Sequence, residues 1–159
     1  MKIGLALREL HRSERKLARD LSTLAARYRT EHEVYHVALD IAAWSRNHLR
    51  LLADAASRYD VDLDGNPRTR ALTGPLQEKV AVLLGRRPEP GLLLLADLRH
   101  LHRVAAGASL DWELLAQSAQ AVGDSDLLAV CQRCHPGTLR QMRWANSTLK
   151  ILSPQVLTS

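Results

Sequence analysis

Apolar residues recur at alternating spacings of four and three along four stretches of this chain, a pattern that aligns them on one face of an α-helix. The first two stretches predict helices over about residues 2–28 and 31–59. Thr30 and Glu33 have the spacing of a capping box, which predicts a turn before the second helix and therefore an antiparallel hairpin. We call each row of residues that this spacing aligns on one helix face a seam. The first seam consists of Ile3, Leu7, Leu10, Glu14, Leu17, Leu21, Leu24 and Tyr28, and the second of Val34, Ala38, Ile41, Ser45, His48, Leu52, Ala55 and Tyr59.

The last two stretches predict a second hairpin, with helices over about residues 92–122 and 125–152 and a turn at Gly123 and Asp124. Pro136 and Gly137 predict a kink or a break in the last helix, because proline lacks a backbone N–H and clashes with the preceding turn. The third seam consists of Leu94, Leu98, Leu101, Ala105, Ala108, Trp112, Leu115, Ala119 and Val122, and the fourth of Leu128, Cys131, His135, Thr138, Met142, Ala145, Leu149 and Leu152.

Residues 60–91 interrupt the helical pattern, and one short helix is predicted within them over about residues 75–84. A helix of some twenty-six residues is about 39 Å long, a length that a connector of about thirty residues can cover. We therefore expect a long crossover between the two hairpins. The chain is predicted to be a single all-α domain over residues 1–159, a four-helix bundle.

Composition agrees with long helices, because the chain is rich in leucine, alanine and arginine and has no phenylalanine. Its net charge of +5 comes from 18 arginines and 4 lysines. The arginines are spread over every predicted helix among acidic residues, which favours a solvated surface over a nucleic-acid interface. No apolar run is long enough for a signal peptide or a membrane span, so we expect a cytoplasmic protein without membrane contact.

Glu14, Ser45 and His48 are the polar members of the first two seams. They lie at similar distances from the predicted turn, so they are expected to face one another inside the bundle. A carboxylate among leucines is costly unless it finds an opposite charge, hydrogen-bond donors or a metal ion. The three residues are therefore the main chemical signal in the sequence.

The order of the helices, the long crossover, Glu14 and His48 resemble the ferritin-like superfamily, especially its small bacterial stress-protein members. The resemblance implies a di-iron or di-manganese centre, which needs a Glu from each of two helices and a Glu-x-x-His pair from each of the other two. Three of those four carboxylates are missing here. The residues found at the corresponding positions are Ser45 on the second helix, Ala105, Ala108 and Trp112 on the third, and Thr138 and Met142 on the fourth.

Two interpretations of the polar residues follow. Glu14, His48 and His135 could converge on a single iron, manganese or zinc ion. Alternatively, His48, Ser45 or a neighbouring arginine satisfies Glu14 in a buried hydrogen-bonded cluster that fixes the register of the helices. The sequence favours the second interpretation.

Cys131, Cys134 and His135 match the Cys-x-x-Cys-His attachment pattern of c-type haem. Haem attachment of this kind follows export, and the sequence offers neither an export signal nor a phenylalanine to line the pocket. Two buried, reduced cysteines are the alternative that we favour.

The sequence therefore predicts a ferritin-like bundle with a degenerate metal site that acts as a non-catalytic binding or assembly module. A metal-dependent redox or stress-response protein and a haem protein are the rival hypotheses. Trp44, Trp144 and the arginines are predicted to lie on the surface and to support a homo-oligomer or a complex with a protein partner.

Overall fold

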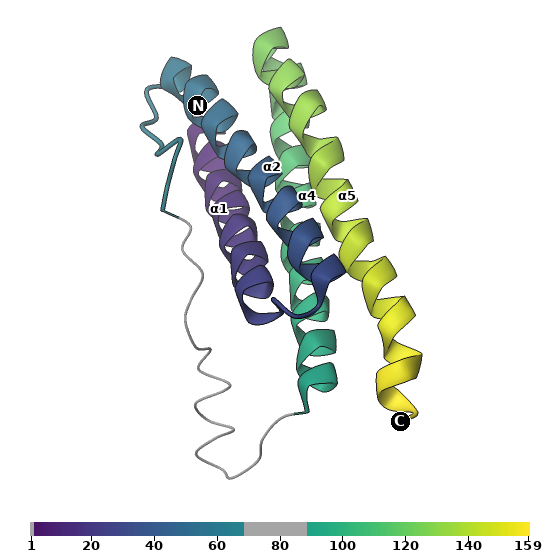
Figure 1. Ribbon diagram of the computed structural model, residues 1–159. Helices are drawn as coiled ribbons and strands as arrows, with labels where there is room; N and C mark the ends of the chain where they lie inside the picture. Colours follow the sequence, from purple (N-terminus) through teal and green to yellow (C-terminus); the bar gives the residue numbers. More distant parts are fainter. Residues whose placement is uncertain (1, 69–88) are drawn as a thin grey trace.

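The computed structural model describes residues 2–68 and 89–159. This part of the chain contains four long helices and no β-strand, which confirms the predicted all-α class. The helices pack side by side along most of their length (Figure 1). They are α1 (Ile3–Arg27), α2 (His32–Ala56), α4 (Pro90–Val122) and α5 (Ser125–Leu157), and the short 3₁₀ helix η1 (Ser57–Tyr59) follows α2.

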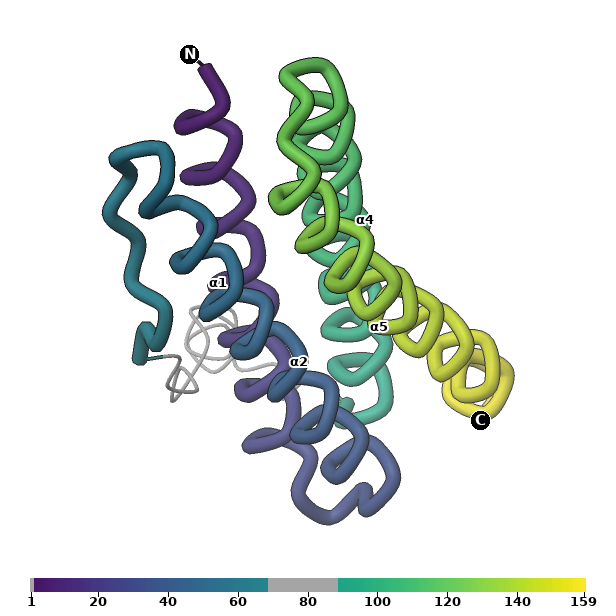
Figure 2. Tube along the Cα trace, turned by 90° about the horizontal axis from the view of Figure 1, so that it is seen from above, coloured from purple at the N-terminus to yellow at the C-terminus, as the bar shows by residue number. Residues whose placement is uncertain are grey.

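The helices form two antiparallel hairpins, α1 with α2 and α4 with α5 (Figure 1). The hairpins pack together through α1 against α4 and α2 against α5, and Figure 2 shows this arrangement from above. The end of α2 and the start of α4 lie at opposite ends of the bundle. The crossover therefore joins two points about one helix length apart, as predicted. The short helix expected over residues 75–84 lies outside the described residues.

The predicted break in the fourth helix is wrong, because α5 is helical without interruption through Pro136 and Gly137. The kink that was the other expectation for this pair stays a prediction. Pro136 lies on the exposed side of α5, and so does Gln132, whose carbonyl loses its helical N–H partner to the proline. Water can solvate a carbonyl on that side, so the helix tolerates the proline there. For the same reason α5 continues past Pro154, which is also exposed, and ends at Leu157.

The start of α2 differs from prediction in its capping, whereas the turn predicted at Gly123 and Asp124 is confirmed. Glu31 occupies the N-cap position of α2 and makes no side-chain cap bond, so the predicted capping box is wrong. α4 starts at Pro90, where proline suits the first turn. It ends at Val122 and is followed by Gly123, whose φ of 72° is left-handed and favours glycine. Asp124 then caps α5, accepting a hydrogen bond from the Leu127 backbone N–H at 2.9 Å.

Three of the four predicted seams form the core. Every member of the first is buried, and so are the members of the second except Tyr59 and those of the third except Val122. These seams place Glu14, Ser45 and His48 in the interior, as the sequence predicted.

The fourth seam is rotated from the predicted one. Leu128, His135 and Met142 lie at the flank of α5, each only partly buried. The true seam has the same alternation of four and three but a different starting point, which brings Gln141 into the core. The buried face of α5 consists of Leu127, Cys131, Cys134, Gly137, Thr138, Gln141 and Ala145.

The apolar core is divided into two clusters. One lies toward the α1–α2 turn and includes Leu21, Ile41 and Leu98. The other lies toward the α4–α5 turn and includes Leu7 and Leu115. Buried polar residues occupy the level between them, and these residues form the candidate site described below.

Polar contacts fasten the bundle at both ends. Tyr28, at the end of α1, donates a hydrogen bond to Asp97 of α4 at 2.7 Å, and Arg27 pairs with the same carboxylate. At the opposite end Tyr59 donates to Asp124 in the α4–α5 turn. Each hairpin is thus joined to the other near its turn.

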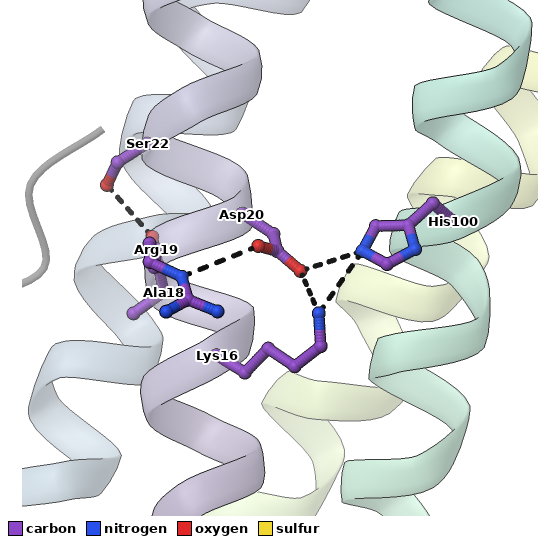
Figure 3. A network of polar contacts seen from close by, with 6 residues as sticks. All are labelled: Lys16, Ala18, Arg19, Asp20, Ser22 and His100. Atoms are coloured by element: carbon purple, nitrogen blue, oxygen red, sulfur yellow. Dashed lines mark hydrogen bonds and ion pairs between the residues drawn. The ribbon is translucent and has the colours of Figure 1, made fainter. Parts of the chain in front are cut away.

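A third contact joins α1 to α4 along their shared edge (Figure 3). The Asp20 carboxylate lies 3.0 Å from Lys16 Nζ and 3.0 Å from Nε2 of His100 on α4. The His100 side chain is 55% exposed and is also engaged within the bundle.

None of the helices in the described ranges combines the length and the apolar character that a membrane span requires.

Candidate functional site: a buried polar cluster around Glu14

Glu14 lies at the centre of the bundle and is completely buried. Its Oε1 atom accepts hydrogen bonds from Trp112 Nε1 and Thr138 Oγ1, both at 2.7 Å. His48 Nδ1 lies 3.2 Å from the same oxygen. Each of the four long helices therefore contributes one side chain. We call Glu14, His48, Trp112 and Thr138 the Glu14 cluster.

The His48 ring is held on three sides. It stands edge-on to the Trp112 indole, with ring centroids 5.8 Å apart and an interplanar angle of 86°. On the α5 side it packs against Gly137, where an added Cβ would lie 3.0 Å from Nε2 and 3.1 Å from Cε1. Glycine at this position therefore makes room for the imidazole. Nδ1 is within ion-pair distance of Glu14 but is not directed at Oε1 as in a good hydrogen bond.

Opposing effects act on the Glu14 carboxyl group. Burial raises its pKa, because a charge is poorly solvated inside the protein. The His48 imidazole and the donors from Trp112 and Thr138 favour the charged form and outweigh burial. The pKa of Glu14 therefore lies below its usual value, and the carboxylate is charged at neutral pH.

A second polar contact lies one turn away. Gln141 Nε2 donates to the Ile41 carbonyl at 2.7 Å and to Ser45 Oγ at 2.9 Å. It links α5 to α2, whereas the Glu14 cluster links all four helices. Ser45 thus bonds to Gln141 rather than to Glu14, contrary to one of the sequence interpretations.

His135 is not part of the Glu14 cluster. It lies on the flank of α5, where its Nε2 is 2.8 Å from Ser109 Oγ on α4. Across residues 2–68 and 89–159, no three His, Cys, Asp or Glu side chains are grouped closely enough to hold a metal ion. The metal site predicted from Glu14, His48 and His135 stays a prediction. The observed contacts favour the other interpretation, the buried hydrogen-bonded cluster.

The cluster also does not fit the di-metal centre that the ferritin-like resemblance implies. The groups that face Glu14 from α4 and α5 are an indole N–H and a hydroxyl, which donate hydrogen bonds to the oxygen that a metal would need. Glu14 Oε2 is buried and has no hydrogen-bond partner among the described residues. Trp112 and Thr138 thus stabilise Glu14 as an anion through its Oε1 atom.

Cys131 and Cys134 are buried and are not joined in a disulfide. Both belong to the apolar cluster near the α4–α5 turn. Burial raises the pKa of Cys131 to about 11 and that of Cys134 to about 12, so both stay protonated. The burial of both side chains supports the interpretation as buried, reduced thiols, and haem attachment stays the alternative prediction.

The two surface tryptophans differ. Trp44 is 38% exposed and lies under the Arg140 guanidinium. The central carbon of this guanidinium is 5.2 Å from the centroid of the Trp44 ring. Trp144 is partly buried against the core and is thus less exposed than predicted, and its role in self-association stays a prediction.

Comparisons with protein-family models, with curated proteins and with solved structures found no match for this chain. The interpretation of the site therefore rests on its own geometry. That geometry is closed, with no member of the Glu14 cluster more than 5% exposed. A closed cluster of one acceptor and converging donors can fix helix register, but it offers no access for a substrate.

Sequence reasoning found Glu14 and His48 but missed three of their neighbours. Trp112 and Thr138 were noted for lacking a carboxylate, although their N–H and O–H groups are the donors that Glu14 requires. Gln141 was missed because the fourth seam was placed in the wrong phase. A search for donors, as well as ligands, at the level of Glu14 would have found the first two.

The first prediction concerns the charge of Glu14. Because its pKa is lowered in the folded protein, Glu14 adds stability above the ordinary glutamate pKa of about 4.5, and this stability is lost as the pH falls through the lower folded value. In Glu14→Gln we expect a folded protein that is less stable at neutral pH by about 1.5–3 kcal/mol. The difference from the parent should shrink below about pH 4. Urea unfolding between acidic and neutral pH measures it.

A matched substitution tests the donors. Glu14→Leu leaves Trp112 and Thr138 without their acceptor and removes the carboxylate beside His48, so we expect it to cost about 3–5 kcal/mol, more than Glu14→Gln. Equal stabilities for the two variants at every pH would show that the cluster contributes no specific polar interaction.

The second prediction compares two helical glycines. Gly137→Ala should destabilise the protein by about 1–3 kcal/mol, because the new Cβ displaces His48 from its place beside Glu14. Gly107→Ala is the control, since no atom lies within 4 Å of its added Cβ. Alanine there should stabilise α4 by up to about 1 kcal/mol. Thermal unfolding of dilute protein distinguishes the two, and a stabilising Gly137→Ala would contradict the packing of His48.

Proposed function

We propose that this chain is a ferritin-like four-helix bundle that acts as a non-catalytic binding and assembly module. Its closed interior supports the non-catalytic part of the proposal. The polar groups of the Glu14 cluster are engaged in holding four helices together, and the donors on α4 and α5 replace the carboxylates of a di-metal centre. The function is then expected at the outer surface.

The outer face of α4 is the observation that carries the proposal. Leu110 and Leu114 are 61% and 63% exposed and lie one turn apart on this face. Single exposed leucines are common on protein surfaces, whereas neighbouring ones form a patch that favours protein contacts. Gly107 precedes them on the same face and leaves open space above it.

The outer surfaces of α1 and α5 carry charges at comparable places. Arg8, Arg12 and Arg15 are exposed on α1, and Arg140 and Arg143 are exposed on α5. A charged, solvated face is the expected state of an outer helix surface. The apolar stretch of α4 departs from it and is the best candidate for a contact with another polypeptide.

The third prediction tests this assignment by photo-crosslinking of the full chain in the cells that express it. A benzophenone amino acid at position 110 should give adducts with protein, because a binding face keeps a partner within reach. The matched control carries the same group at position 12, on the charged outer face of α1. Adducts at position 110 and not at position 12 are expected. No adduct at position 110, or equal yields at both positions, would contradict the proposal.

A further inference from the structure

A second seam runs along α4, on the side opposite its core seam. It keeps the alternation of four and three residues that the buried seam has, so its members are aligned along the outer face. We call it the outer seam. It consists of Arg103, Gly107, Leu110, Leu114, Gln117 and Ala121, all exposed.

The composition of the outer seam is unusual for a solvated helix face. Between Arg103 and the end of α4 the seam contains no charged side chain. Gly107 costs about 1 kcal/mol relative to alanine in a helix interior. Its open surroundings show that no close contact within the described chain explains this glycine. A glycine beside exposed leucines is what a closely approaching helix would require.

Positive and negative side chains lie at different levels along the outer seam. Arg99 and Arg103 lie toward its start and Glu113 lies farther along, and all three are exposed. None of them forms a salt bridge or a side-chain hydrogen bond with another described residue. The face therefore has a basic part and an acidic part, both free to pair.

We propose that two copies of this chain dimerise through antiparallel α4 helices, with Leu110 of each copy seated over Gly107 of the other. This inference rests on the proposed function and names its partner. In this register Arg103 comes level with Leu114 of the second copy. Glu113 of that copy is the neighbouring residue, so its level along the helix axis differs from that of Arg103 by about 1.5 Å, the rise of one residue. A two-fold axis repeats each Arg103–Glu113 pair.

Charge selects the second copy and the antiparallel direction. A parallel pairing in register would place Arg103 beside Arg103 and Glu113 beside Glu113, and both contacts would be repulsive. The antiparallel pairing converts the same residues into two attractive contacts. The face is therefore complementary to itself, and no other protein is needed to supply opposite charges or an apolar surface.

The interface would be modest, because one helix pair buries less surface than a standard stable complex. We expect a dimer that dissociates on dilution. The fourth prediction is that sedimentation equilibrium of the full chain, from about 1 μM to about 1 mM, gives a mass that rises from one chain toward two. Leu110→Glu should weaken dimerisation at least about tenfold, because it buries a charge against the second copy.

Ile151→Glu is the matched control. Ile151 is 66% exposed on α5, away from the outer seam, so the same change of an exposed apolar residue to glutamate should leave the dimer unaffected. Gly107→Ala should also weaken the dimer, although it stabilises the isolated helix. Circular dichroism establishes that each variant keeps its fold.

Charge reversal tests the register. Arg103→Glu and Glu113→Arg should each weaken self-association at least about tenfold, because each variant places like charges opposite one another. An equimolar mixture of the two variants should restore the dimer, since the glutamate introduced in one variant then faces the arginine introduced in the other. A merely misfolded variant could not give this outcome. Failure of the mixture to dimerise would overturn the register.

The remaining outcomes separate this inference from the proposed function. A parent chain that stays monomeric up to about 1 mM overturns the dimer. Crosslinks at position 110 to another protein would then leave the binding module intact. A parent dimer that Leu110→Glu does not weaken overturns the α4 interface and leaves assembly through another face.

Discussion

The buried carboxylate of Glu14 is the constraint on which this bundle depends. Removing such a charge from water is costly, and the cost is offset only if donors from several directions reach it together. Here α2, α4 and α5 each supply one group to an oxygen on α1. A shift of any helix by one turn would leave the carboxylate without part of this shell. The apolar clusters on either side tolerate small slips more readily, so the polar level sets the register for both.

Much of the fold could be predicted from the sequence, because long helices repeat their apolar spacing many times. The repeated spacing located three seams and brought Glu14 and His48 together. It failed on α5 because two phases of the same spacing fit that stretch almost equally well. One phase buries Met142 and exposes Gln141, and the apolar residue was the natural choice. Gln141 can be buried because its amide donates hydrogen bonds to two acceptors on α2, the Ile41 carbonyl and Ser45 Oγ.

The predicted break at Pro136 failed for a related reason. Local sequence indicates that proline removes a helical hydrogen bond, but it does not indicate on which side of the helix the loss occurs. Pro136 lies on the exposed side, where water can solvate the carbonyl that loses its partner. Gly137 next to it faces inward and accommodates His48. Gly137, one of the two residues that were expected to break α5, thus makes room for a member of the Glu14 cluster.

The two seams of α4 connect the interior of the proposed module to its surface. The inner seam contributes Trp112, which both donates to Glu14 and packs edge-on against His48. The outer seam carries Leu110 and Leu114, which flank Trp112 in sequence. Because the cluster holds α4 in a fixed rotation, it also fixes which residues α4 presents outward. A rigid helix loses little conformational entropy on binding, so a buried polar cluster without chemistry of its own can still serve assembly by pre-organising an external face.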